Sequence, residues 1–358
     1  MVSNASSAVT RAPFGRMPDG RDVDVFTLTS AQGLEVRAIS YGAIVVSLHA
    51  PDRSGHLDDV VLGHDDLEGY LDASPYFGAV VGRYANRIAR GRLPLEGRVH
   101  QLAINDPPNH LHGGVRGFDK VIWDAEEDAS ATAASVTFRY ASRAGEERYP
   151  GTLRAAVTYT VTDGDDLRVD YSARTDGTTV VNLTQHSYFN LAGGGRGDVL
   201  GHVLTIDADH YLPIDATSIP TGAVVPVAGT PFDFRAPAAI GLRIDAADEQ
   251  LAHGAGYDHC YVVRRGGPGL VTAARLDEPV SGRRIEVRTT EPGVQFYSGN
   301  RLDGRVRGKS GRAYPPRAGL SLETQHYPDS PNHPEFPSTV LQPGQEYRST
   351  TVFTFGVC

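Results

Sequence analysis

The chain has 358 residues, with 34 Lys and Arg against 43 Asp and Glu, which gives a formal net charge of −9. Because no lysine-rich run offsets this charge, we expect neither nucleic acid nor an anionic membrane as a partner. Hydrophobic residues at 40% and charged residues at 22% are typical of a globular chain with enough apolar material for a core.

Short strands joined by tight turns are the dominant prediction along the chain. The 40 Gly and 23 Pro are scattered without a period, and apolar residues alternate with polar ones at a period of two. Helical patterns are expected only at 65–72 and 245–252. The expected strands are 34–48, 135–141, 155–161, 166–173, 203–207, 284–290, 294–297, 319–325 and 350–357. This pattern predicts an all-β fold, a large antiparallel β-sandwich, with residues 1–358 as a single domain.

Two of the segments have an unusual polar face. If 180–191 is one strand, one face carries only uncharged hydrogen-bonding groups and a histidine, namely Asn182, Thr184, His186, Tyr188 and Asn190. In the strand at 319–325, Glu323 shares a face with Ser321 and Gln325 while Leu320 and Leu322 point the other way, and a carboxylate there is costly to bury without partners or a task. We interpret both faces as the lining of a polar pocket, with a structural glutamate or a surface face as the alternative.

Several other chemistries find less support in the sequence. His110 and His112, two residues apart, would share a strand face as metal ligands do, but no HExxH motif or cysteine pair accompanies them. The sequence contains no GxSxG elbow, phosphate-binding GxxxxGK[ST] loop or strand–helix GxGxxG. Asp258 and Glu323 are candidates for the paired carboxylates of a glycoside hydrolase.

The location of the protein is predicted from what the sequence lacks. Its first 15 residues have no apolar stretch of the length that a secretory signal needs, and no segment approaches the roughly 20 apolar residues of a membrane span. The only cysteines, Cys260 and Cys358, cannot form a disulfide framework. We therefore expect a cytoplasmic protein.

Four distinctive motifs occur in order along the chain: GRYANRI (82–88), LHGGVRGFDK (111–120), LTQHSYFNLAG (183–193) and LETQHYPD (322–329). Together with SYGAIVVSLHAPDRSG near the start and LQPGQEYRSTTVFTFGV near the end, they resemble the aldose 1-epimerase (galactose mutarotase) family over nearly the whole length. Gln185 and His326 depart from the family pattern without removing a group that the reaction requires.

The resemblance implies a large antiparallel sandwich and an enzyme that interconverts the α and β anomers of a free aldohexose. Such a reaction needs one base for the C1 hydroxyl, one acid for the ring oxygen, and no metal, nucleotide or other cofactor. By resemblance, Glu323 is the expected base and His186 the expected acid. The substrate-binding residues implied in the same way are Asn86, Arg87, His112, Tyr188, Asp258 and Gln295.

For this assignment to work near neutral pH, we expect Glu323 to be ionised, with Arg87 favouring its charge, and His186 to be protonated or able to borrow a proton readily. Asn86 would point to the opposite strand face from Arg87 if the backbone there is extended, which would give it a supporting role. The expected partner is a small aldose, and the expected assembly a monomer or a homodimer. Three alternatives stay open: a non-catalytic carbohydrate-binding or sensing protein, a glycoside hydrolase, and a phosphosugar epimerase that would use Arg116 or Lys120.

Overall fold

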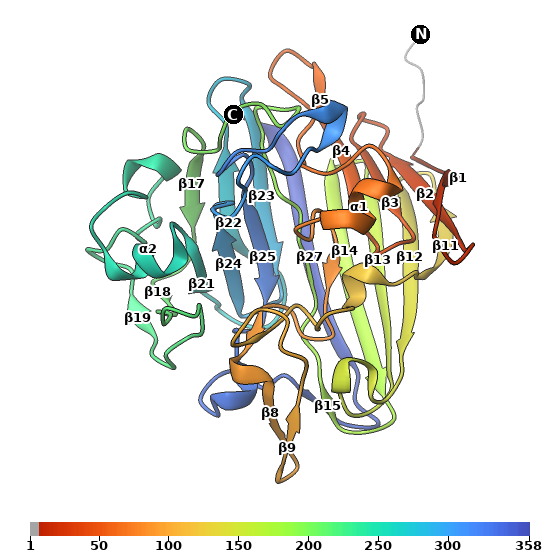
Figure 1. Cartoon of the computed structure of the whole chain (residues 1–358). Helices are drawn as coiled ribbons and strands as arrows, with labels where there is room; N and C mark the ends of the chain where they lie inside the picture. Colours follow the sequence, from red (N-terminus) through yellow and green to blue (C-terminus); the bar gives the residue numbers. More distant parts are fainter. Residues whose placement is uncertain (1–6) are drawn as a thin grey trace.

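The computed structural model describes residues 7–358 and consists mainly of antiparallel strands (Figure 1). The predicted single domain and the N-terminal segment include residues 1–6, which lie outside the described residues. The largest sheet has nine strands, in the order β11-β12-β13-β14-β27-β23-β22-β17-β20. In that order their bounds are Asp124–Ala129, Ala133–Ser142, Leu153–Thr162, Asp166–Thr175, Tyr347–Val357, Arg283–Thr289, Val271–Asp277, Val203–Ile206 and Ala238–Ala239.

Two five-stranded sheets form the opposite layer. The first has the order β1-β2-β3-β4-β5, with bounds Ala8–Arg16, Asp22–Thr29, Glu35–Ile39, Val45–Pro51 and Leu57–Asp59. The second has the order β19-β18-β21-β24-β25, with bounds Val225–Pro226, His210–Tyr211, Asp258–Val262, Gly293–Tyr297 and Ser321–Gln325. One continuous apolar core contains side chains from all three sheets, among them Phe26, Phe138, Phe296, Leu322 and Phe353. The predicted sandwich is therefore confirmed, with its second layer divided in two.

Short elements connect these sheets. The two α-helices are α1 (Leu67–Ala73) and α2 (Glu249–Gly254), and each begins at an aspartate whose side chain accepts a backbone N–H. The two-stranded pairs are β6 (Val80–Val81) with β16 (Thr184–Gln185), β7 (Arg87–Ile88) with β10 (His110–Leu111), β8 (Arg92–Leu95) with β9 (Arg98–Gln101), and β15 (Thr179–Val180) with β26 (Val340–Leu341). Single-turn 3₁₀ segments occupy Ala89–Gly91, Phe118–Lys120, Glu146–Arg148, Ile240–Leu242, Lys309–Gly311 and Ser330–Asn332. No helix within residues 7–358 has the length and apolar character that a membrane crossing requires.

Two of the expected strands are broken. The segment 34–48 divides into β3 and β4 because Gly42 and Ala43 have positive φ values of 63° and 47°. The segment 180–191 is not one strand, since only β16, the end of β15 and isolated bridges at Asn182 and Phe189 pair there. Asn182 and Asn190 instead donate side-chain hydrogen bonds to the carbonyls of Ala85 and Ala318, so their amides hold the crossing backbone in place.

Candidate active site

The second five-stranded sheet supplies one wall of the candidate site. Its strand register places Asp258 beside Tyr297 and Gln295 beside Glu323. Because side chains alternate across a strand, Leu322 and Phe296 face the core while these four residues face the other way. Glu323 is therefore fixed on a regular strand with an apolar layer directly behind it.

The opposite wall comes from the irregular segments that cross between the sheets. His186 follows β16, and its backbone N–H and C=O bond to Ala79 and Gly78. Arg87 begins β7, where it pairs with Leu111. These short pairings hold side chains from distant parts of the chain against one sheet.

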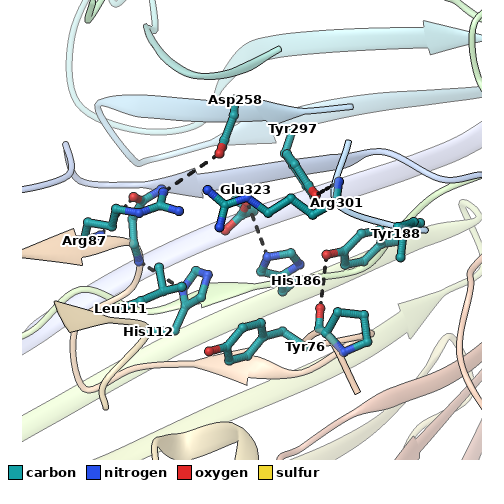
Figure 2. Close-up of a pocket in the computed structure, with 13 residues that line it drawn as sticks. Tyr76, Arg87, Leu111, His112, His186, Tyr188, Asp258, Tyr297, Arg301 and Glu323 are labelled. Carbon is teal, nitrogen blue, oxygen red and sulfur yellow. Dashed lines mark hydrogen bonds and ion pairs between the residues drawn. The ribbon is translucent and has the colours of Figure 1, made fainter. Parts of the chain in front are cut away.

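These walls enclose a cavity of about 120 Å³ (Figure 2). Thirteen residues line it: Pro75, Tyr76, Asn86, Arg87, Leu111, His112, His186, Tyr188, Asp258, Tyr297, Arg301, Leu302 and Glu323. Seven of the eight predicted site residues are in this group, and Gln295 is the exception. Gln295 lies beside the cavity and donates from Nε2 to Asp258 Oδ1 at 2.8 Å, so its own contact with a ligand stays a prediction.

His186 and Glu323 lie at the centre of the cavity. Nε2 of His186 is 3.7 Å from Oε1 of Glu323, and the two side chains are only 5% and 3% exposed. Ser321 Oγ lies 3.4 Å from His186 Nδ1, while Glu323 Oε2 has no hydrogen-bond partner among residues 7–358. The two groups are close enough to act on two atoms that share one carbon, and neither is tied to the other by a hydrogen bond.

Burial shifts both groups toward their uncharged forms. The pKa of Glu323 is raised to about 8 by burial and by the charge of Asp258, and Arg87 offsets only part of this shift. Burial lowers the pKa of His186 to about 4. The expectation of an ionised Glu323 is therefore wrong, because the cost of burying its charge exceeds the attraction of Arg87. His186 is neutral as well, so it must borrow a proton to act as an acid. At neutral pH the pair holds one titratable proton, and this proton is on the carboxyl group of Glu323.

His112 faces the cavity as a hydrogen-bond donor. The backbone N–H of Asn86 donates to its Nδ1 at 3.1 Å, which fixes the ring proton of the neutral imidazole on Nε2. Burial holds the pKa of His112 well below its usual range, so the ring stays neutral. Asn86 and His112 have positive φ values of 63° and 50°. Because the backbone at Asn86 is left-handed rather than extended, Asn86 and Arg87 line the same cavity instead of pointing to opposite faces of a strand.

Arg87 and Asp258 face each other, and each is held in place by a further residue. Nε of Arg87 donates to Asp106 at 2.9 Å, and its Nη1 lies 3.9 Å from Asp258 Oδ2. The Arg87 side chain is only 6% exposed. Since Gln295 also donates to Asp258, this carboxylate is held in one orientation with its second oxygen directed toward Arg87.

Tyrosine rings orient His186. Tyr188 stacks on the imidazole with ring centroids 5.1 Å apart and donates its hydroxyl to the carbonyl of Pro75. Tyr76 stacks on the same imidazole at 5.9 Å and meets His112 edge-on at 4.6 Å. Because the rings pack on it, the imidazole is held in position without a charge partner.

Sequence reasoning missed six of the lining residues: Pro75, Tyr76, Leu111, Tyr297, Arg301 and Leu302. Tyr297 could have been predicted from the sequence, because it follows Gln295 by two residues on the same strand face. Arg116 and Lys120, the candidate residues for a phosphosugar epimerase, do not line the cavity, and Lys120 instead binds Asp119.

The proposed pairing of His110 and His112 on a strand face is wrong, since β10 ends at Leu111 and His110 is bound to the Ala103 carbonyl and the Tyr149 hydroxyl. A different set, His112, His186 and Glu323, has ligand atoms within 4.8 Å of one another, the composition of a catalytic zinc site. However, His112 would have to lose the Nε2 proton that the Asn86 N–H keeps there, and Arg87 adds positive charge. The donor set therefore suits an organic hydrogen-bonding ligand better than a cation.

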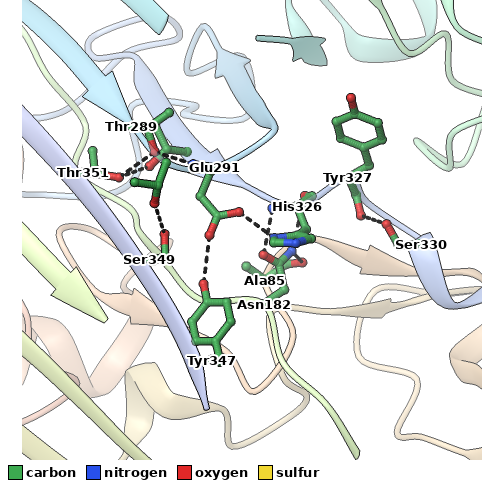
Figure 3. Close-up of polar contacts among 12 residues, drawn as sticks. Ala85, Asn182, Thr289, Glu291, His326, Tyr327, Ser330, Tyr347, Ser349 and Thr351 are labelled. Atoms are coloured by element: carbon green, nitrogen blue, oxygen red, sulfur yellow. Dashed lines mark hydrogen bonds and ion pairs between the residues drawn. The ribbon is translucent and has the colours of Figure 1, made fainter. Parts of the chain in front are cut away.

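A second glutamate–histidine pair anchors the end of the strand that carries Glu323 (Figure 3). Glu291 accepts from His326 Nδ1 at 2.6 Å and from the Tyr347 hydroxyl at 3.0 Å. The side chain of Asn182 bonds both the N–H and the C=O of His326. This cluster holds the segment after Glu323 against the crossing segment that leads to His186.

Comparison with known proteins identifies the family. Residues 24–354 match the sequence model of the family described as aldose 1-epimerase. The chain belongs to the aldose 1-epimerase family. It is 50% identical to galactose mutarotase of Rattus norvegicus over 98% of this chain and 99% of that one, and 38% identical to aldose 1-epimerase of Escherichia coli K12 over 94% and 96%.

Solved structures agree with this assignment. Galactose 1-epimerase from Lactobacillus acidophilus superposes with a TM-score of 0.86 at 28% identity, covering 98% of this chain and 99% of that chain. A GalM/aldose epimerase homologue from C. elegans gives 0.83 at 29% identity, with the same coverage. The family resemblance and the fold predicted from the sequence are both confirmed.

Proposed function

We propose that this aldose 1-epimerase family member interconverts the α and β anomers of free aldohexoses such as galactose and glucose. The observation that carries the proposal is the His186–Glu323 pair, 3.7 Å apart in one cavity and holding one proton between them at neutral pH. Mutarotation needs one group that accepts a proton and one that donates a proton, positioned on two oxygens of the same carbon.

The reaction begins when the shared proton moves from Glu323 to His186, which leaves the number of protons on the pair unchanged. The Glu323 carboxylate then takes the proton of the C1 hydroxyl, while the imidazolium donates its proton to O5. The C1–O5 bond breaks as the C1 carbonyl forms. After rotation about C1–C2, O5 attacks the other face of the carbonyl, and the two protons return to the groups that supplied them.

The surrounding residues bind the sugar. Nε2–H of His112 and the Arg87 guanidinium donate to oxygens at the reacting end, and both raise the effective acidity of the hydroxyl they bind. Asp258 accepts from ring hydroxyls, in an orientation set by Gln295. Asn86 and Tyr188 complete the lining, and holding the sugar in register with the acid and the base lowers the entropic part of the barrier.

Polarimetry of freshly dissolved α-D-galactose or α-D-glucose tests the proposal directly. The purified protein should speed the decay of optical rotation, with the same rate in the presence of a metal chelator. Sugar binding without a faster decay would contradict the proposal in favour of a carbohydrate sensor. Release of sugar from an aryl glycoside would favour a glycoside hydrolase.

The cellular setting rests on the sequence. We propose a cytoplasmic protein that acts as a monomer or a homodimer on a small aldose. Nucleic acid and membrane partners are not expected, because its net charge of −9 is spread without basic runs.

A further inference from the structure

An arginine that no motif predicted stands at the opening of the catalytic cavity. Arg301 lines the cavity, yet its side chain is 58% exposed. Its backbone N–H donates to the Tyr297 hydroxyl at 2.9 Å, which fixes the base of the side chain on the cavity wall. In Figure 2 the side chain runs across the cavity, in front of Glu323 and toward Arg87.

The N–H groups of the Arg301 guanidinium make no hydrogen bonds within the part of the chain that the structure describes. Its nearest carboxylate oxygen is Oδ1 of Asp106, at 3.7 Å. Asp106 is already bonded to Arg87 Nε at 2.9 Å, so its charge is shared between the two arginines. Two other arginines on the same loop are engaged locally, Arg305 with Asp303 and Arg307 with the Gly311 carbonyl.

The charge of the lining differs from that of the whole chain. Arg87 and Arg301 are positive and Asp258 is negative, while Glu323 is uncharged at neutral pH because burial raises its pKa to about 8. Asp106, which contacts both arginines, brings the sum of these charges to zero in a protein of net charge −9. Arg301 is the most exposed of the charged lining residues, and no carboxylate among the described residues accepts a hydrogen bond from its guanidinium.

We propose that Arg301 is a specificity-determining residue that binds the exocyclic group of the aldose and lets the site accept hexuronic acids. This inference rests on the proposed mutarotase function. The C6 carboxylate is attached to C5, the ring carbon on the other side of O5 from C1, and its two oxygens match the fork of a guanidinium. The C6 carboxylate takes no part in ring opening, so the proton transfers by Glu323 and His186 are the same as for a neutral sugar.

The test compares freshly dissolved α-D-galactose with α-D-galacturonic acid at neutral pH, after subtraction of the spontaneous rate. The wild-type protein should act on both. Arg301→Met should lower kcat/KM for galacturonate about 10- to 100-fold more than for galactose, because a hydrogen-bonded charge pair is lost, and the loss should lie in KM. Arg301→Lys should keep part of the preference. Arg305→Met is the matched control, since Arg305 is 91% exposed and outside the cavity lining, and it should change neither rate.

The outcomes separate this inference from the proposed function. A wild-type protein inactive on both sugars would overturn the mutarotase function itself. Activity on galactose with an unchanged ratio of the two sugars in Arg301→Met, or no activity on galacturonate, would overturn the role of Arg301 alone. Galactose 6-phosphate serves as a third substrate: a dependence on Arg301 seen only with the phosphate would contradict the carboxylate assignment, and a dependence seen with the carboxylate supports it.

Discussion

Two glutamate–histidine pairs lie along the same strand, one in the cavity and one just after the strand ends, and they differ in their protonation. In the cavity, Glu323 and His186 lie 3.7 Å apart, and burial shifts their pKa values to about 8 and about 4. At the end of the strand, His326 Nδ1 lies 2.6 Å from Glu291, and here the pKa of the glutamate is lowered and that of the histidine is raised. The first pair is uncharged at neutral pH, and the second is an ion pair.

For the two glutamates, the difference in pKa comes from their partners rather than from their depth in the fold. Glu323 and Glu291 are 3% and 2% exposed. Glu291 receives hydrogen bonds from His326 and from the Tyr347 hydroxyl, whereas Glu323 Oε2 receives none among the described residues. A buried carboxyl with partners is stable as a carboxylate, and one without partners keeps its proton. The unpartnered pair is the one with a proton free to move and with hydrogen-bonding capacity left for a ligand.

The largest effect is expected from Glu323→Gln. Mutarotation should fall by about 10²–10⁴-fold, because proton transfer by this group is lost while the shape of the cavity is kept. Polarimetry with α-D-galactose measures the loss. A fully active variant would contradict the role of Glu323.

The same variant should be more heat-stable than the wild type. In the fold the pKa of Glu323 is raised from 4.5 to about 8, so ionisation favours the unfolded chain increasingly as pH rises through this window. The gain in Tm of Glu323→Gln over the wild type should therefore grow from pH 5 to pH 8, as measured by thermal unfolding. A gain that shrinks over this range would contradict the raised pKa.

Glu291→Gln should show the opposite pattern. Removing one partner from a buried ion pair leaves His326 charged or forces it to lose its proton, and we expect a loss of about 3 kcal/mol in the free energy of unfolding, at the lower end for buried pairs because the His326 side chain is 22% exposed. Denaturant unfolding measures this loss. The activity of the folded variant should fall far less than that of Glu323→Gln, and an equal fall would show that the pair in Figure 3 is not mainly structural.

The pH dependence of kcat/KM sharpens the comparison. Catalysis needs the form of the pair with one titratable proton, which exists between the pKa of His186, about 4, and that of Glu323, about 8. Activity should fall below this range because both groups are protonated, and above it because the acid is lost. A profile centred on the ordinary pKa values of a solvent-exposed glutamate and histidine would contradict the shifts caused by burial.

The smallest effect is expected from Tyr188→Phe. The phenylalanine keeps the stacked ring over His186 and loses only the hydrogen bond to the Pro75 carbonyl, for which we expect about 1 kcal/mol in stability. Mutarotation should change by only a few fold. A loss as large as that of Glu323→Gln would mean that the hydroxyl itself takes part in proton transfer.

The sandwich could be predicted because alternating strands carry a signal in every residue, as in the hairpin formed by 155–161 and 166–173, which lies within β13 and β14. Seven lining residues were reached through short motifs. Tyr76 and Arg301 could not be found in that way, because they reach the cavity on loops whose positions depend on packing between distant segments. The charge of Glu323 was mispredicted because it depends on how many hydrogen-bond partners the fold leaves it, which no local pattern records.

The proposed mechanism depends on Glu323 keeping the single titratable proton of the catalytic pair at neutral pH. Infrared difference spectroscopy of the wild type against Glu323→Gln measures this directly through the carbonyl band of a protonated carboxyl group. The band should be present at pH 6 and disappear as pH rises past about 8. A carboxylate band at pH 6, accompanied by an imidazolium signal from His186, would contradict the account.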